Sequence, residues 1–142
     1  MTNTQTVQFP ADTLERVHKI IKRYPEGKQK SALLPILHLA QAEWRWLSSE
    51  VMDYVAGLLS IKPIEVYEVA TFYTMFHLEP VGEHVIEYCR TGPCCLTGGG
   101  EVYDHLKKKL GVETGGTSAD GKFTVKEVEC LAACGWGPVF QI

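Results

Sequence analysis

Residues 85–94 read Val-Ile-Glu-Tyr-Cys-Arg-Thr-Gly-Pro-Cys, an apolar strand-like run that ends on one cysteine and enters a loop closed by a second. Residues 123–134, Phe-Thr-Val-Lys-Glu-Val-Glu-Cys-Leu-Ala-Ala-Cys, have the same plan, in which a loosely alternating run leads into a short loop between two cysteines. A helix is predicted between them over 101–110, with Gly111 as its stop. With a further extended stretch at 139–142, this order of strand, helix, strand and strand predicts a small α/β layer.

The residues before this layer predict a small antiparallel helical bundle, because four short segments with apolar stripes follow one another through short connections. The first segment carries apolar residues at helical spacing over 14–24 and ends at Pro25. The others are predicted at 32–44 after an N-cap at Ser31, at 51–59 after a cap at Ser48 or Ser49, and from Pro63 to about Phe76. The fold class is therefore α+β with an α/β layer, and the chain divides near Glu79-Pro80 into a helical region, 1–78, and a second domain, 79–142.

Composition excludes several classes of protein. Of the 142 residues, 45% are hydrophobic and 22% are charged, which is ordinary globular usage and not that of a disordered or collagen-like chain. No apolar run is long enough for a membrane span, so we expect no membrane insertion. The first ten residues have neither a basic start nor an apolar core, so no secretory signal or transit peptide is expected. The net charge of −3 resides in residues 79–142 and no basic stripe is present, which argues against nucleic-acid binding.

The five cysteines all lie in the second half of the chain, at Cys89, Cys94, Cys95, Cys130 and Cys134. A secreted disulfide scaffold usually spreads an even number of cysteines along its chain. An odd cluster in a chain without an export signal instead indicates a reducing compartment and a metal or redox site.

Four of these cysteines form two closely spaced pairs, Cys89-x4-Cys94 and Cys130-x3-Cys134. Each pair follows a predicted strand, so the two loops can converge at neighbouring strand ends and offer four thiolates to one soft metal site. The spacing alone favours structural zinc and a [2Fe–2S] cluster equally. Buried free thiols and a redox disulfide are also compatible with the pattern, although the chain has no C-x-x-C. Cys95 adjoins Cys94 and should point elsewhere, so we expect a small buried thiol and not a ligand.

The cysteine segments resemble the thioredoxin-like [2Fe–2S] subunit of the NADH dehydrogenase module of respiratory complex I. The resemblance also includes Asp120-Gly-Lys-Phe-Thr in the second half, and Leu37-His-Leu-Ala-Gln, Trp46-Leu-Ser and Val66-Tyr-Glu-Val-Ala-Thr-Phe-Tyr-Thr-Met-Phe in the helical half. It covers roughly residues 12–142 and favours iron–sulfur over zinc. It implies that Cys89, Cys94, Cys130 and Cys134 ligate one [2Fe–2S] cluster in a thioredoxin-like domain.

The resemblance also implies partners. The helical region is expected to dock on a flavoprotein subunit that binds FMN and NADH, so that this chain has no independent active site and accepts one electron from the reduced flavin. The implied complex is NADH:quinone oxidoreductase on the cytoplasmic face of a bacterial membrane, together with other peripheral-arm subunits. NAD-linked hydrogenases and formate dehydrogenases use an equivalent subunit and are the nearest alternative. A zinc-stabilised interaction module and a thiol–disulfide oxidoreductase are more distant functional hypotheses for the same cysteines.

Two features depart from the family pattern. Ala132 stands where a glycine is common between the second pair of cysteines. The family's domain continues with another strand and a helix after the position of Ile142, so we expect a truncated form with an exposed sheet edge.

The fourth helix has two apolar faces. One is an ordinary core stripe that includes Val66 and Ala70, and the other carries Phe72 and Met75, which predicts a partner contact with Trp44 or Trp46 nearby. Two further residues have structural interpretations. His38 lies among apolar residues and is predicted to be a core histidine, and Trp136 is predicted either to screen the cluster or to cover hydrophobic surface.

Overall fold

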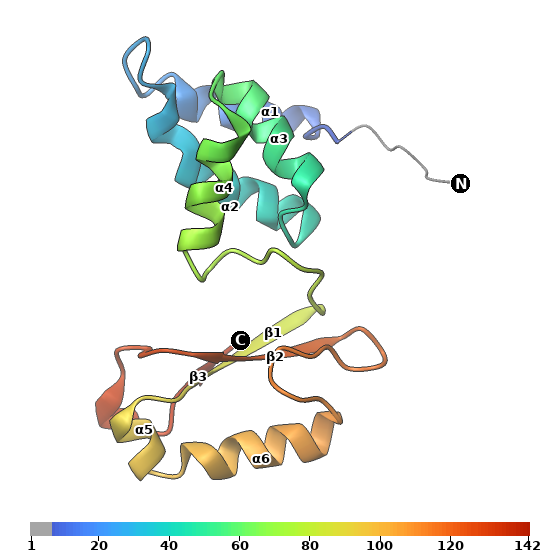
Figure 1. Ribbon diagram of the computed structural model, residues 1–142, viewed down its shortest axis with the longest axis vertical. Helices are drawn as coiled ribbons and strands as arrows, with labels where there is room; N and C mark the ends of the chain where they lie inside the picture. The colour runs from blue at the N-terminus through green and yellow to red at the C-terminus, as the bar shows by residue number, and fades with distance from the viewer. Residues whose placement is uncertain (1–6) are drawn as a thin grey trace. The chain divides into compact units, whose positions relative to one another are not determined.

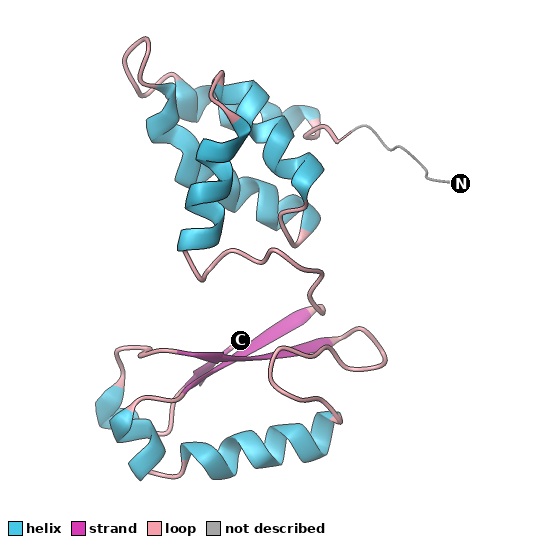
Figure 2. Ribbon diagram, viewed as in Figure 1, coloured by secondary structure: helices cyan, strands magenta, loops and turns pink. Residues whose placement is uncertain are grey.

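The computed structural model describes residues 7–142 and divides the chain into two compact units, one through Pro80 and one from Val81 to Ile142. The first unit contains helices and loops, and the second contains a sheet with helices (Figure 2). The secondary structure is thus of the mixed helix-and-sheet class predicted from the sequence.

The first unit is a helical bundle (Figure 1). Its elements are α1 (Ala11–Ile21), the 3-10 turn η1 (Gln29–Ala32), α2 (Leu33–Trp44), α3 (Ser49–Leu59) and α4 (Pro63–Phe72). Each α-helix contributes side chains to one core, whose most completely buried members include Val17, Ile36, Leu37, Val55, Leu59 and Val66. The predicted stripes therefore face inward, which is how such short helices are stabilised.

Two predicted helix starts are confirmed and one is wrong. The Ser48 hydroxyl caps α3 by accepting from the Val51 N–H at 3.3 Å, and α4 begins at Pro63. Ser31, however, lies inside η1, and Ala32 occupies the N-cap position of α2. The 3-10 turn runs directly into α2, so that the hydroxyl is not at the position where capping is needed.

The cap of α3 leads to a prediction on stability. Ser48→Ala should lower the free energy of unfolding by about 1 kcal/mol, because the Val51 N–H loses its acceptor. The neighbouring Ser49→Ala is the matched control and should have a smaller effect, since Ser49 is exposed in the first turn of the helix. Chemical denaturation followed by circular dichroism measures both. Equal losses for the two variants would show that the cap contributes nothing.

Helix α4 ends at Phe72 and not near Phe76, so the predicted end is wrong by about one turn. Tyr73 has extended backbone angles, and Phe76 returns to the core at 4% exposure. The Gln41 amide stabilises this return, since its Nε2 donates to the Met75 carbonyl at 2.8 Å and its Oε1 accepts from the His77 N–H at 2.6 Å. Burial of Phe76 and these hydrogen bonds replace the last predicted helical turn.

One predicted side-chain environment in the bundle is also wrong. His38 is exposed, with its ring 5.1 Å from that of Phe76, and is not a core histidine. Trp44 contacts Phe9, at a ring separation of 4.7 Å, and Tyr54, at 6.3 Å. Of the two tryptophans predicted as alternatives near Phe72 and Met75, Trp44 thus packs with Phe9 and Tyr54, and the placement of Trp46 stays a prediction.

The second unit is built on a three-stranded sheet in the order β2-β1-β3. The strands are β1 (His84–Cys89), β2 (Phe123–Val128) and β3 (Phe140–Gln141); β1 is parallel to β2 and antiparallel to β3. Helices α5 (Gly92–Leu96) and α6 (Gly99–Leu110) connect β1 to β2. Figure 1 shows α6 running along one face of this sheet, where Tyr103 stacks on Tyr88 at a ring separation of 4.9 Å. The predicted stop at Gly111 is confirmed, since Gly111 is the C-cap with φ of 66°.

The segment predicted as a glycine- and cysteine-rich loop contains the short helix α5, which the sequence pattern did not indicate. Pro93 lies in its first turn, where the absence of an N–H costs nothing. A single turn is too short to show helical periodicity in the sequence. Within residues 7–142, none of the helices has the length and apolar character that crossing a membrane requires.

Candidate functional site

The two cysteine pairs meet at one end of the sheet because β1 and β2 are parallel and end together. Cys89 is the last residue of β1 and is paired in register with Val128, the last residue of β2. Cys130 follows two residues later, and Cys134 begins the 3-10 turn η2 (Cys134–Trp136). Helix α5 carries Cys94. The convergence of loops at neighbouring strand ends, predicted from the sequence, is confirmed.

Within this end of the sheet, the four sulfurs form two pairs. Cys89 and Cys94 are buried, at 3% and 1% exposure, and their side chains are joined by a hydrogen bond. Cys130 and Cys134 are exposed, with their Sγ atoms 3.8 Å apart. Electrostatic interactions of Cys134 with Cys94 and with Cys89 connect the two pairs. All four predicted ligands therefore lie together, one pair inside the fold and one at its surface.

Hydrogen-bond donors surround the Cys89 sulfur. The Thr91 hydroxyl lies 3.2 Å from Cys89 Sγ, and the backbone N–H groups of Thr91 and Leu131 also donate to it. The pKa of the Cys89 thiol is accordingly lowered to about 7, first by the Thr91 hydroxyl and then by these N–H groups. Donors of this kind offset negative charge on sulfur.

The sulfurs of Cys94 and Cys134 have fewer hydrogen-bond donors than the Cys89 sulfur. The pKa of Cys94 is raised: the Val139 N–H lowers it, but the hydrogen bond with Cys89, burial and the nearby sulfurs together outweigh that donor. The pKa of Cys134 is raised first by its hydrogen bond with Cys130 and then by the charge of that sulfur. Hydrogen bonds with a neighbouring sulfur, burial and the charges of the other sulfurs thus raise both pKa values, and a bound metal centre would favour the deprotonated forms.

Backbone geometry around the second pair bears on the family departure at Ala132. The Ala132 N–H donates to Cys130 Sγ at 3.3 Å, and Ala132 has φ of 58°, in the left-handed region that favours glycine. The hydrogen bond to sulfur is thus made with a residue that carries a Cβ in a strained backbone conformation.

The structure places Cys95 differently from the prediction. Cys95 is exposed and not buried, and its thiol donates to the Arg90 carbonyl at 3.0 Å. Successive residues of a helix point about 100° apart, so α5 turns Cys94 inward and Cys95 outward. Trp136 is 86% exposed, so within this chain its ring neither screens the sulfurs nor covers hydrophobic surface, contrary to both predicted roles.

The arrangement fits a two-iron centre. A [2Fe–2S] cluster held by four cysteines has two thiolates on each iron, so it requires two pairs of sulfurs at one place. The chain supplies two such pairs, with N–H and O–H groups directed at the sulfurs. In the described part of the chain, no three Cys, His, Asp or Glu side chains converge as they would on a single metal ion.

A family comparison agrees with this geometry. The family model of the thioredoxin-like [2Fe–2S] ferredoxins matches residues 17–142. The chain belongs to this family. The cofactor of a thioredoxin-like [2Fe–2S] ferredoxin is a [2Fe–2S] cluster, and the paired cysteines described above are where this chain can hold one.

Curated relatives of this ferredoxin bear complex I names. The chain is 46% identical over 143 residues to the E subunit of NADH-quinone oxidoreductase from Rickettsia conorii, covering 99% of this chain and 86% of that protein. It is 44% identical over 135 residues to the mitochondrial NADH dehydrogenase (ubiquinone) flavoprotein 2 of Dictyostelium discoideum, covering 94% of this chain and 55% of that protein. Both relatives are named as parts of NADH-oxidising oxidoreductases.

A solved structure shares the fold. A chain of a NAD+-reducing [NiFe]-hydrogenase in the air-oxidized state superposes with a TM-score of 0.67 at 22% identity, covering 76% of this chain and 18% of that one. The similarity concerns the fold alone, and this ferredoxin corresponds to a small part of the hydrogenase chain.

Sequence reasoning found the cysteines but did not identify which residues contact their sulfurs. The N–H donors of Leu131 and Val139 carry no sequence signal, since every residue except proline has such a group. Thr91 did carry a signal, because a threonine between two proposed ligands has a hydroxyl within reach of the sulfur.

Proposed function

We propose that this ferredoxin is an electron-transfer subunit of NADH:quinone oxidoreductase, in which Cys89, Cys94, Cys130 and Cys134 hold one [2Fe–2S] cluster. The observation that carries the proposal is the meeting of two cysteine pairs at one end of the sheet. The names of the curated relatives support the choice of complex. A [2Fe–2S] cluster supplies one-electron chemistry, which suits an acceptor for the reduced FMN of a partner flavoprotein.

The two cysteine pairs differ in their exposure to solvent. The buried Cys89 and Cys94 lie inside the fold, where water is excluded and Cys89 receives three donors. The exposed Cys130 and Cys134 open the site toward the surface, where a partner can approach. With a cluster bound, Cys130 and Cys134 would hold the side of it that lies nearest the protein surface.

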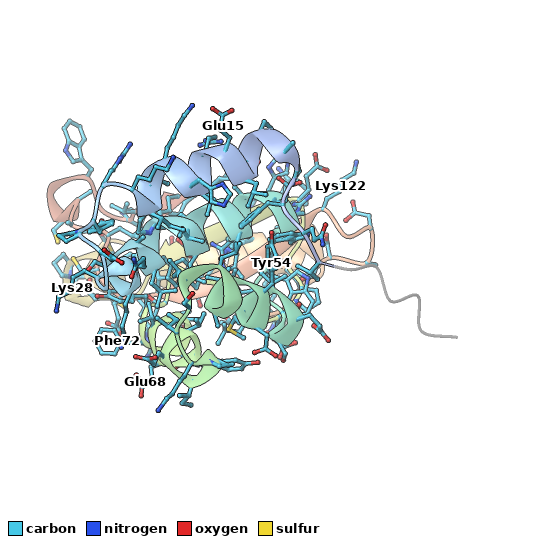
Figure 3. The ribbon with its side chains drawn as sticks, turned by 90° about the horizontal axis from the view of Figure 1, so that it is seen from above. Glu15, Lys28, Tyr54, Glu68, Phe72 and Lys122 are labelled. Carbon is cyan, nitrogen blue, oxygen red and sulfur yellow. The ribbon has the colours of Figure 1, made fainter. Side chains whose placement is uncertain are left out.

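The end of α4 is the proposed docking surface for the flavoprotein that binds FMN and NADH. Phe72 is 75% exposed and its ring projects outward from the helix (Figure 3), while Met75 is 40% exposed. Tyr73 stacks edge-on against Phe72 at a ring separation of 5.0 Å. Large apolar side chains grouped in this way are typical of a buried subunit contact.

Charged substitutions test this surface. Phe72→Glu combined with Met75→Glu should weaken co-purification with the flavoprotein at least about tenfold, because aromatic anchors at a contact commonly contribute more than 1 kcal/mol each. Lys19→Glu on α1 is the control for added negative charge and should have little effect, since Lys19 is an exposed member of an i,i+4 pair. Quantitative pull-down from the assembled complex measures the retained partner. Full retention by the double variant would exclude this surface as the dock.

Spectroscopy tests the cofactor and its role. Anaerobic purification should yield two irons and two sulfides per chain, with an S = 1/2 EPR signal that appears on reduction by dithionite. A colourless protein with one zinc would instead establish an interaction module. Disulfide reductase activity that survives iron removal would establish a thiol–disulfide oxidoreductase.

The subunits that co-purify determine the complex. NADH:quinone oxidoreductase predicts a flavoprotein and other peripheral-arm subunits, at the cytoplasmic face of a bacterial membrane. The shared fold with the hydrogenase favours one second candidate, an equivalent subunit of an NAD-linked hydrogenase. Hydrogenase subunits in the purified complex would support that candidate and contradict the first.

A further inference from the structure

The Thr91 hydroxyl contacts a cysteine sulfur and does not cap the helix that follows it. Thr91 is the N-cap of α5, where a threonine hydroxyl ordinarily accepts a hydrogen bond from the first turn of the helix. The Thr91 hydroxyl makes no such bond here. The helix is capped only by the Thr91 backbone carbonyl, which accepts from the Cys95 N–H at 3.0 Å. The hydroxyl instead lies 3.2 Å from Cys89 Sγ.

Ligation fixes the direction of this hydrogen bond. In a free thiol, either the sulfur or the hydroxyl can be the donor. A metal-bound cysteine is a thiolate and has no proton to donate, so the Thr91 hydroxyl must then be the donor and Cys89 the acceptor. Cys89 is also buried, so water does not compete strongly for its sulfur.

We propose that the Thr91 hydroxyl raises the reduction potential of the cluster by donating a hydrogen bond to the Cys89 sulfur. This inference rests on the proposed function, because it requires that Cys89 be a ligand. One-electron reduction adds negative charge to the sulfurs, and a hydrogen bond to an acceptor strengthens as that acceptor becomes more negative. The bond therefore stabilises the reduced form more than the oxidised form, and Thr91 acts as a positioning residue for the ligand.

Replacement of the hydroxyl tests the proposal. In the purified complex, Thr91→Val should retain iron and sulfide but lower the midpoint potential measured by EPR-monitored titration. We expect the ratio of reduced to oxidised cluster at a fixed potential to fall about tenfold, which is 59 mV for one electron. Thr91→Ser keeps the hydroxyl and should restore the original potential. The iron–sulfur stretching frequencies in resonance Raman spectra should shift in the valine variant and not in the serine variant.

Thr97→Val is the matched control. Its hydroxyl lies in the same segment but donates to the backbone carbonyls of Pro93, at 2.8 Å, and Cys94, at 3.3 Å, and not to a sulfur, so the potential should not change. Equal potentials in wild type and in a loaded Thr91→Val protein would overturn the proposal. Loss of the cluster in both Thr91→Val and Thr91→Ala would also overturn it, in favour of a role in assembly. Failure of the proposed function is distinguishable, since the wild-type protein would then lack iron and sulfide.

Discussion

Cys94→Ala should abolish the iron–sulfur centre, whereas the same substitution at the adjacent Cys95 should leave it intact. The two cysteines are neighbours on one helical turn, but Cys94 is 1% exposed and hydrogen-bonded to Cys89, while Cys95 is exposed and bonded to the Arg90 carbonyl. Removal of one of four thiolates leaves an iron with an open position that water can attack. Alanine is the appropriate replacement, because a serine oxygen can itself ligate iron.

Iron and sulfide assays on anaerobically purified proteins measure the effect, together with the EPR signal after reduction. We expect less than about a tenth of the wild-type iron in Cys94→Ala and full iron in Cys95→Ala, by analogy with the strong dependence of metal affinity on its ligands. Circular dichroism of both variants controls for unfolding. A loaded Cys94→Ala protein, or an empty Cys95→Ala protein, would contradict the assignment of ligands.

The sequence predicts the plan of this site well because the plan depends on local patterns. Strand-like runs that end at Cys89 and shortly before Cys130 place both loops at one sheet end once the strands pair in parallel. The stop at Gly111 follows from the freedom of glycine at positive φ, and the cap at Ser48 follows from a hydroxyl that can accept from the first turn of the helix. Apart from the parallel pairing of the two strands, these features need no knowledge of tertiary contacts.

The features that were missed depend on contacts between distant residues. Helix α4 ends early because Phe76 is drawn into the core and Gln41, more than thirty residues earlier, binds the following segment. His38 lies among apolar residues in the sequence but is exposed in the bundle, because the helix turns its neighbour Leu37 into the core. A local pattern contains none of this information.

Close packing between α6 and the segment that carries Cys94 explains one of the glycines, and it predicts opposite effects for two adjacent substitutions. Gly99 is buried in the first turn of α6, and a Cβ added there would lie 2.8 Å from the Cys94 carbonyl oxygen and 3.2 Å from its carbonyl carbon. Both contacts are with backbone, which moves only if the Cys94 segment is displaced. Gly100 is the next residue of the same helix, and a Cβ added there meets nothing within 4 Å.

Gly99→Ala should therefore destabilise the fold by about 1–3 kcal/mol, the usual cost of overpacking, and should also lower the iron content because Cys94 is pushed from its position. Gly100→Ala should be neutral or should stabilise the fold by up to about 1 kcal/mol, because alanine is favoured over glycine in a helix. Thermal denaturation and iron assays on the same preparations measure both effects. If Gly99→Ala were as stable and as fully loaded as Gly100→Ala, the contact between α6 and Cys94 would not hold the ligand in place. Because the two substitutions are expected to change stability in opposite directions, the comparison distinguishes the contact with Cys94 from a general effect of alanine in α6.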